Sequence, residues 1–91
     1  MSGLPEGQLK VAAGFRLQWE EAQQTHVLLY PEGMVTLNES SAQILQLCDG
    51  TLSAEGVVTA LEQRYPEADL ADDVRDFLSV ANQNGWLQST T

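Results

Sequence analysis

Hydrophobic and polar residues follow two different periods along the chain, first that of a strand and then that of a helix. In FRLQW, residues 15–19, every second residue is apolar, which is typical of a strand with one buried face. The apolar run of residues 27–30 is continuous, as expected for a central strand that is covered on both sides. Residues 34–37 are expected to form the next strand. We therefore expect an antiparallel sheet of three strands.

The second and third strands are joined by Pro31, Glu32 and Gly33. Proline presets φ near −65°, and glycine adopts the left-handed region at little cost. This order predicts a hairpin with a type I turn that closes on a G1 bulge, with Gly33 in the left-handed conformation.

Two helices with polar caps are expected after the third strand. Asn38 precedes residues 39–48, and Ser53 precedes residues 54–65. Side chains of these types accept a backbone N–H that the first turn of a helix leaves unpaired. Gly50 is expected to end the first of the two helices.

The third helix carries the widest apolar surface of the chain. We expect it to open at Asp69 and to end at Gly85, which suits a C′ position. Its apolar stripe follows helical spacing and consists of Leu70, Val74, Phe77, Leu78 and Ala81. Val80 and Leu78 lie on opposite flanks of this stripe and widen the apolar arc to about 160°. Such an arc is wide for a helix with a single neighbour.

A chain of 91 residues is long enough for one small domain. Residues 1–14 contain Gly3, Pro5 and Gly7 without a period, so we expect a flexible N-terminal arm. The domain itself is expected over residues 15–88, with WLQ as a short tail strand or wing, and residues 89–91 as a disordered tail. The fold class predicted from these elements is α+β.

Charge narrows the choice of partners. Thirteen acids stand against four bases, which gives a formal charge of −9, and a phosphate backbone would repel such a chain. The partner is expected to be a protein or a peptide, not nucleic acid. No run reaches the roughly 18 apolar residues of a membrane helix, and the first ten residues lack the order of a signal peptide. With a single cysteine, the cytoplasm is the expected location.

The residues for most site chemistry are absent from the sequence. One histidine, His26, and one cysteine, Cys48, are too few for an ordinary zinc site. The acids of ADLADD are explained by helix capping and the helix dipole. We therefore predict no metal, no cofactor and no catalytic residue, and the chain is not expected to be an enzyme.

An open sheet edge is the feature that most suggests a function. MVTL, residues 34–37, contains neither charge nor proline, so its outer backbone groups are available to another strand. If the third helix packs beside this edge, an extended peptide could pair with the strand and rest on the helix. The predicted peptide-binding residues are Met34, Val35, Thr36, Leu37, Val74, Arg75, Phe77, Leu78 and Ala81. The pattern fits equally well with an ordinary surface strand and an ordinary core helix.

Four segments in order, LLYPEG, LN, ILQLCDG and DVRDFL, resemble the PqqD family of pyrroloquinoline quinone (PQQ) biosynthesis. The resemblance extends from about Phe15 to Leu87 and implies a small winged-helix-like domain, with a three-stranded antiparallel sheet followed by a three-helix bundle. It implies a peptide chaperone that binds the ribosomal precursor peptide of PQQ, whose Glu and Tyr become the quinone. The chaperone delivers this peptide to a radical S-adenosylmethionine enzyme.

Related domains recognise leader peptides of other ribosomally synthesised and post-translationally modified peptides (RiPPs), commonly between the third strand and the third helix. On this sequence the resemblance places that site at Met34 to Leu37 and Val74 to Ala81.

Two other functions fit the same elements. A winged-helix transcription regulator shares the architecture, but its recognition helix should be basic, whereas the third helix here carries Asp72, Asp73 and Asp76 against Arg75. A structural subunit could instead pair its open edge with a second copy, which would give a homodimer.

Overall fold

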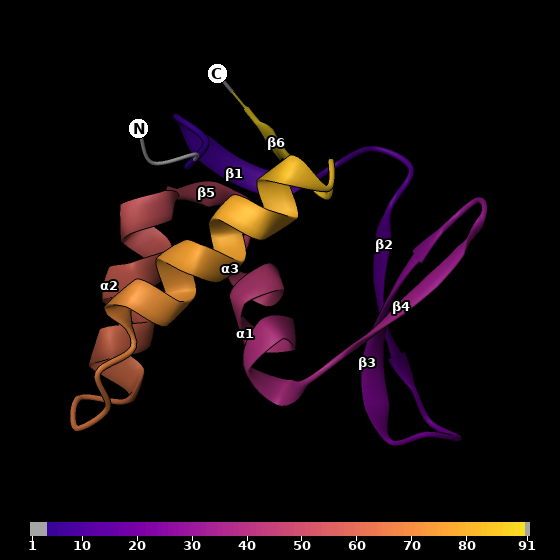
Figure 1. Cartoon of the computed structure of the whole chain (residues 1–91), viewed down its shortest axis with the longest axis horizontal. Coiled ribbons are helices and arrows are strands. Elements are labelled where there is room, and N and C mark those ends of the chain that lie inside the picture. The colour runs from indigo at the N-terminus through magenta and orange to yellow at the C-terminus, as the bar shows by residue number, and fades with distance from the viewer. Residues whose placement is uncertain (1–3, 91) are drawn as a thin grey trace.

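The computed structural model describes residues 4–90, which form six strands and three helices (Figure 1). In chain order the elements are β1 Gln8–Val11, β2 Arg16–Glu20, β3 Thr25–Tyr30, β4 Gly33–Leu37, α1 Glu39–Leu47, β5 Asp49–Ser53, α2 Ala54–Arg64, α3 Ala71–Gln83 and β6 Leu87–Ser89. Figure 1 shows the sheet of β2, β3 and β4 on one side of the helices and the other strands at one end of them. The expected α+β class is confirmed.

The larger hairpin sheet has the order β2-β3-β4 and is antiparallel throughout. Leu28 in the central strand is fully buried and pairs with Leu17 on one side and Val35 on the other. The predicted central strand is therefore confirmed. Helix α1 packs across the inner face of this sheet.

The turn between β3 and β4 differs from the prediction. Tyr30 pairs directly with Gly33, so only Pro31 and Glu32 connect the strands. Gly33 is not among the residues with positive φ, and the predicted G1 bulge is wrong. Because Gly33 already pairs in register, no extra residue remains for a bulge to accommodate.

A second sheet, with the order β5-β1-β6, was not predicted. Residues 8–11 fall within the expected flexible arm, yet they form the central strand of this sheet, with Leu9 fully buried. Ser89 belongs to β6, and the Thr90 N–H donates to the Gln8 carbonyl at 2.8 Å. These residues are therefore ordered by pairing, while residues 1–3 and 91 lie outside the described part of the chain.

The helix caps are partly as predicted. The Asn38 side chain accepts the Ser41 N–H at 2.8 Å, and the Ser53 hydroxyl accepts the Gly56 N–H at 3.1 Å, which confirms both caps. Helix α1 ends at Leu47 rather than at Gly50, because residues 49–53 pair with β1 as strand β5.

Helix α3 begins at Ala71 instead of Asp69. Its N-cap is Leu70, which makes no side-chain cap bond. The Leu70 side chain packs against the core, and this packing fixes where the helix starts. At the other end, Gly85 has φ +78° and the Trp86 N–H bonds the Ala81 carbonyl at 2.9 Å. This is the Schellman arrangement that glycine favours, so the predicted C′ position is confirmed.

One hydrophobic core joins both sheets to the helices. Its largest fully buried side chains include Leu9 from β1, Leu28 from β3, Leu45 from α1 and Leu78 from α3. Since every layer contributes to the same core, the sheet edge and the helices are held in a fixed relation.

Candidate peptide-binding site

The free edge of β4 is the first part of the site. Within residues 4–90, β4 pairs only with β3, on one side. The pair Tyr30–Gly33 flanks a two-residue connection, so it exchanges hydrogen bonds, and hydrogen-bonded pairs then alternate along the ladder. On this alternation the backbone N–H and C=O of Met34 and Thr36 point away from β3.

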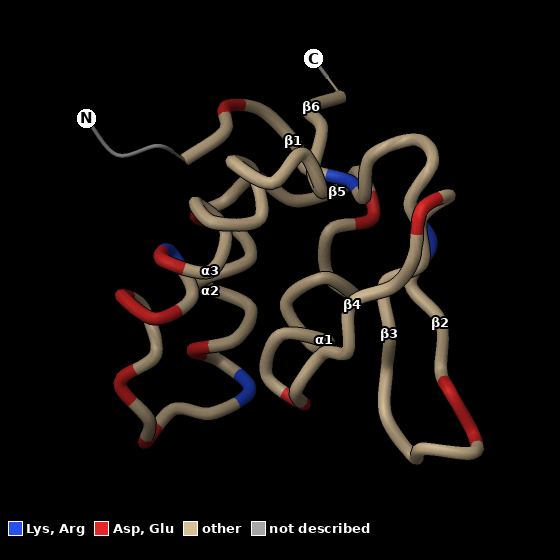
Figure 2. The backbone as a smooth tube through the Cα atoms, turned by 45° about the vertical axis from the view of Figure 1, so that its right-hand side comes forward, with Lys and Arg blue, Asp and Glu red and all other residues tan. Residues whose placement is uncertain are grey.

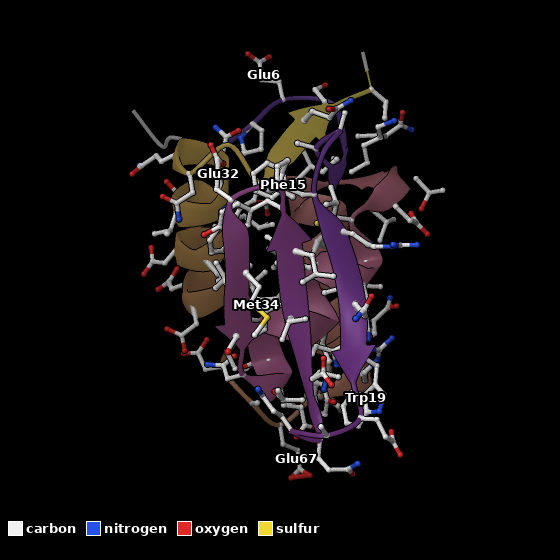
Figure 3. The ribbon with its side chains drawn as sticks, turned by 90° about the vertical axis from the view of Figure 1, so that its right-hand side faces the viewer. Glu6, Phe15, Trp19, Glu32, Met34 and Glu67 are labelled. Atoms are coloured by element: carbon white, nitrogen blue, oxygen red, sulfur yellow. The ribbon has the colours of Figure 1, made fainter. Side chains whose placement is uncertain are left out.

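The side chains of β4 divide between the two faces of the sheet. Met34, 46% exposed, and Thr36 lie on the outer face, and Figure 3 shows Met34 on the face turned toward the viewer. Val35 is half-buried and Leu37 is buried on the inner face. The strand therefore offers a guest its backbone edge, while two of the four predicted side chains hold it to the core.

Helix α3 presents a different flank from the one that sequence spacing emphasised. Leu78 and Ala81 are fully buried and Val74 is nearly so. These three predicted contact residues pack into the core, and of the three only Val74 also lines a pocket. Phe77 is half-buried, and Val80, which was not among the predicted site residues, is 50% exposed. The accessible apolar flank is thus formed by Phe77 and Val80.

Arg75 is committed to another role. Its guanidinium donates two hydrogen bonds of 2.9 Å to the Glu55 carboxylate, and it lies 3.5 Å from Asp72. The bond from Arg75 lowers the pKa of Glu55, and Glu55 in turn raises the pKa of Arg75. This predicted peptide contact therefore links α3 to α2.

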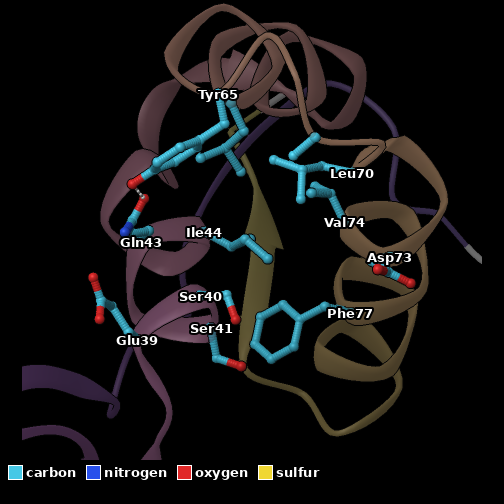
Figure 4. A pocket seen from close by; sticks show the side chains of 12 residues that line it. Glu39, Ser40, Ser41, Gln43, Ile44, Tyr65, Leu70, Asp73, Val74 and Phe77 are labelled. Carbon is cyan, nitrogen blue, oxygen red and sulfur yellow. Dashed lines mark hydrogen bonds between the residues drawn. The ribbon is translucent and has the colours of Figure 1, made fainter.

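A pocket of about 620 Å³ lies between α1, the end of α2 and the start of α3 (Figure 4). Its floor consists of the buried Ile44, Leu61 and Val74, and its walls include Leu70 and Phe77. In Figure 4 the Phe77 ring points from α3 toward the first turn of α1.

Tyr65 forms another wall of the pocket and fixes its shape. The Tyr65 hydroxyl donates to the Gln43 side-chain oxygen at 2.9 Å and so connects α2 with α1. Ile44 lies in α1 and Tyr65 at the end of α2, each within the apolar spacing of its own helix. Nothing in that spacing indicated that the two side chains share a cavity, because the cavity depends on how the helices dock.

Within residues 4–90, Cys48 is buried and the His26 ring contacts a glutamine side chain. Burial, followed by the nearby Asp49 charge, raises the pKa of the Cys48 thiol to about 12. The ring nitrogen Nε2 of His26 lies 3.0 Å from the Gln46 side-chain amide nitrogen, which is within hydrogen-bond distance. Among residues 4–90 no three His, Cys, Asp or Glu side chains are grouped to hold a metal ion. In the same residues no helix is long and apolar enough to cross a membrane.

Negative charge is concentrated at one end of the molecule. Figure 2 shows acidic residues along α2, the connection to α3 and the first half of α3. They are Glu55, Glu62, Glu67, Asp69, Asp72, Asp73 and Asp76. This acidic surface is unlike the surface of a nucleic-acid-binding helix, which needs basic side chains, lysine or arginine, to contact the phosphates.

Comparison with known proteins gives one consistent result. The chain is 47% identical over 88 residues to a protein of Methylococcus capsulatus named PqqA binding protein, and the match covers 97% of this chain and 95% of the relative. A protein of the same name from Azotobacter vinelandii is 54% identical over 76 residues, which is 82% of this chain and 83% of the relative.

A solved structure has the same fold. The solution NMR structure of the PqqD truncation of Methylobacterium extorquens PqqCD, described as a functional and stand-alone RiPP recognition element, superposes with a TM-score of 0.72 at 25% identity. The superposition covers 97% of this chain and 99% of that one. The family model described as coenzyme PQQ synthesis protein D matches residues 25–87. The chain therefore belongs to the PqqD family.

Proposed function

We propose that this chain is a peptide chaperone of pyrroloquinoline quinone biosynthesis. It binds the ribosomal precursor peptide PqqA by strand addition to β4 and presents it to a radical S-adenosylmethionine enzyme. Membership of the PqqD family and the name of the two relatives support the peptide as ligand. The free edge of β4 carries the proposal for how the peptide is held.

The ladder on β4 supplies only part of the binding free energy. Met34 and Thr36 together direct four backbone groups outward, and a hydrogen bond contributes about 1 kcal/mol net. Roughly 4 kcal/mol is well below the 8 kcal/mol or so of a micromolar complex, before the cost of ordering the peptide. Side-chain contacts must therefore contribute, and we propose that the accessible apolar flank of α3 formed by Phe77 and Val80 supplies them.

The protein acts by restricting the peptide rather than by chemistry. Fixing one residue in a single backbone conformation costs about 1–2 kcal/mol, and pairing with a preformed strand pays this cost before the enzyme meets the substrate. Cys48 is buried and protonated, and His26 is engaged with Gln46. Accordingly we propose that the chain has no enzymatic activity of its own.

Amide chemical shifts during a titration with synthetic PqqA test this binding mode. We expect shifts at residues 34–37 together with shifts on α3 around Phe77 and Val80. The amides of β2 serve as the internal control, because β2 is the opposite edge of the same sheet. Shifts confined to β2, or to the sheet of β5, β1 and β6, would reject strand addition to β4.

Pairing of β4 with a second copy is the competing use of the same edge. An uncharged strand edge invites such pairing. Light scattering over a dilution series separates the two functions. A dimer that dissociates when PqqA is added would show that both compete for β4, whereas a peptide that binds without changing the mass leaves the monomer as the binding form.

A further inference from the structure

The pocket between α1, α2 and α3 is separate from the backbone edge of β4. None of the residues that line it belongs to a strand. Its floor and most of its walls are apolar, and they are contributed by all three helices and by the connection between α2 and α3. A pocket of about 620 Å³ is within the roughly 300–1,000 Å³ of typical ligand sites.

Chain continuity places this pocket beside the peptide edge. Strand β4 ends at Leu37, and Asn38 caps α1 directly after it. The next three residues, Glu39, Ser40 and Ser41, form the rim of the pocket. A guest strand that runs off the end of β4 therefore meets the pocket rim without crossing another element.

The rim carries negative charge. Glu39 lies on α1 and Asp73 lies on α3, and both are exposed pocket residues. No lysine or arginine lines the pocket in the described part of the chain. Arg64 approaches from α2, where it donates to Gln43 at 3.4 Å, and Arg75 is bound to Glu55. A cationic guest near Asp73 would consequently meet a carboxylate that lies in the first turn of α3 and is offset by the helix dipole rather than by a basic side chain lining the pocket.

We infer that this pocket selects one large apolar side chain of the precursor peptide, and that a lysine or arginine adjacent to it in the peptide lies against Asp73. This inference rests on the proposed peptide-binding function and adds the class of residue that the domain recognises. Backbone pairing to β4 is tolerant of sequence, since it uses only N–H and C=O groups. The pocket would supply the sequence preference that the strand edge lacks.

The expected effects differ for the two parts of the contact. Burial of a large apolar side chain changes a dissociation constant by about tenfold or more. An ion pair at an exposed rim changes it by only about two- to fivefold, and salt weakens it.

An alanine scan of synthetic PqqA, measured by titration calorimetry against the full chain, tests the inference. We expect one bulky apolar position at which alanine raises the dissociation constant about tenfold or more. In the Leu70→Ala protein the same peptide change should have a much smaller effect, because the two side chains are coupled through the pocket. Independent effects of the two changes would overturn the inference.

Charge reversal at the rim provides a second test that does not disturb the core. Asp73→Lys should weaken binding of PqqA by about two- to fivefold. A peptide in which glutamate replaces the lysine or arginine that lies against Asp73 should restore the affinity. Asp76→Lys is the matched control, since Asp76 is exposed on α3, does not line the pocket and changes the net charge equally.

The outcomes separate this inference from the proposed function. Equal weakening by Asp73→Lys and Asp76→Lys would reduce the charge effect to general attraction and overturn the assigned contact. Normal strand addition to β4 with no apolar position sensitive to Leu70→Ala would overturn the pocket alone. Failure of the wild-type chain to bind PqqA would overturn both the pocket and the proposed function.

Discussion

Proline substitutions along β4 give a direct test of which backbone groups receive the peptide. Thr36→Pro removes an N–H that points away from β3, and the proline ring occupies the space where a guest strand would approach. Val35→Pro removes an N–H that bonds within the sheet. Although the two positions are adjacent, Thr36→Pro should weaken peptide binding, whereas Val35→Pro should lower the stability of the fold.

The register allows the size of each effect to be worked out. Loss of one guest hydrogen bond removes about 1 kcal/mol, or about a fivefold weakening of PqqA binding, and the steric block adds to it. The unfolding free energy of Thr36→Pro should change little, since edge strands accept proline where the N–H faces solvent. Val35→Pro instead leaves the partner carbonyl of Leu28 unpaired at a buried position, which costs about 1–3 kcal/mol of stability.

Fluorescence anisotropy with labelled PqqA gives the dissociation constant, and urea unfolding gives the stability. Thr36→Val is the matched control, because it removes the hydroxyl and keeps the N–H. We expect wild-type binding from Thr36→Val and weakened binding from Thr36→Pro. If the proline variant were as stable as wild type and bound PqqA with wild-type affinity, pairing through the β4 edge would be refuted.

Three further predictions concern the scaffold. Asn38→Ala should lower the unfolding free energy by about 1 kcal/mol in urea titrations, because the Ser41 N–H loses its cap; an unchanged midpoint would contradict this. Since the pKa of Cys48 is raised to about 12, iodoacetamide at pH 8.5 should leave the folded chain unmodified and alkylate it in denaturing urea, as followed by mass spectrometry. The pKa of Glu55 is lowered by Arg75 from its usual 4.5, so its stabilising effect is complete above that value and is lost as the pH falls below it. The stability difference between wild type and Glu55→Gln, measured by thermal unfolding, should therefore shrink below about pH 4.5, and a difference that grows there would show the opposite sign.

The sequence predicted the elements whose side chains repeat a pattern over several turns or strands. The sheet of β2, β3 and β4 and the three helices belong to this class, and their hairpin and polar caps are local features. Strands β1 and β5 do not belong to this class and were not predicted. Each is four or five residues long, and β1 has only Leu9 fully buried. Their pairing joins segments about forty residues apart, which a local period cannot report.

The candidate site was predictable to a smaller extent. The edge position of β4 followed from the continuous apolar run that marks β3 as central. The accessible flank of α3 did not follow, because Leu78 and Val80 are similar apolar side chains on opposite flanks of one stripe. Docking on the core buries Leu78 completely and leaves Val80 half-exposed. Arg75 could not be assigned either, since its partner Glu55 lies on another helix.

The connections between the walls of the site indicate that the protein needs little free energy to reorganise when the peptide binds. Leu37 is buried at the end of β4, and the next residue, Asn38, caps α1, so consecutive, well-packed residues join the strand edge to the pocket rim. The Arg75–Glu55 pair links the first half of α3 to α2, and the Schellman turn closes the other end of the helix. A preorganised site loses little conformational freedom when the peptide binds. The loss of conformational entropy then comes mainly from the peptide. An enzyme that joins two side chains of this peptide requires the peptide to be ordered in this way.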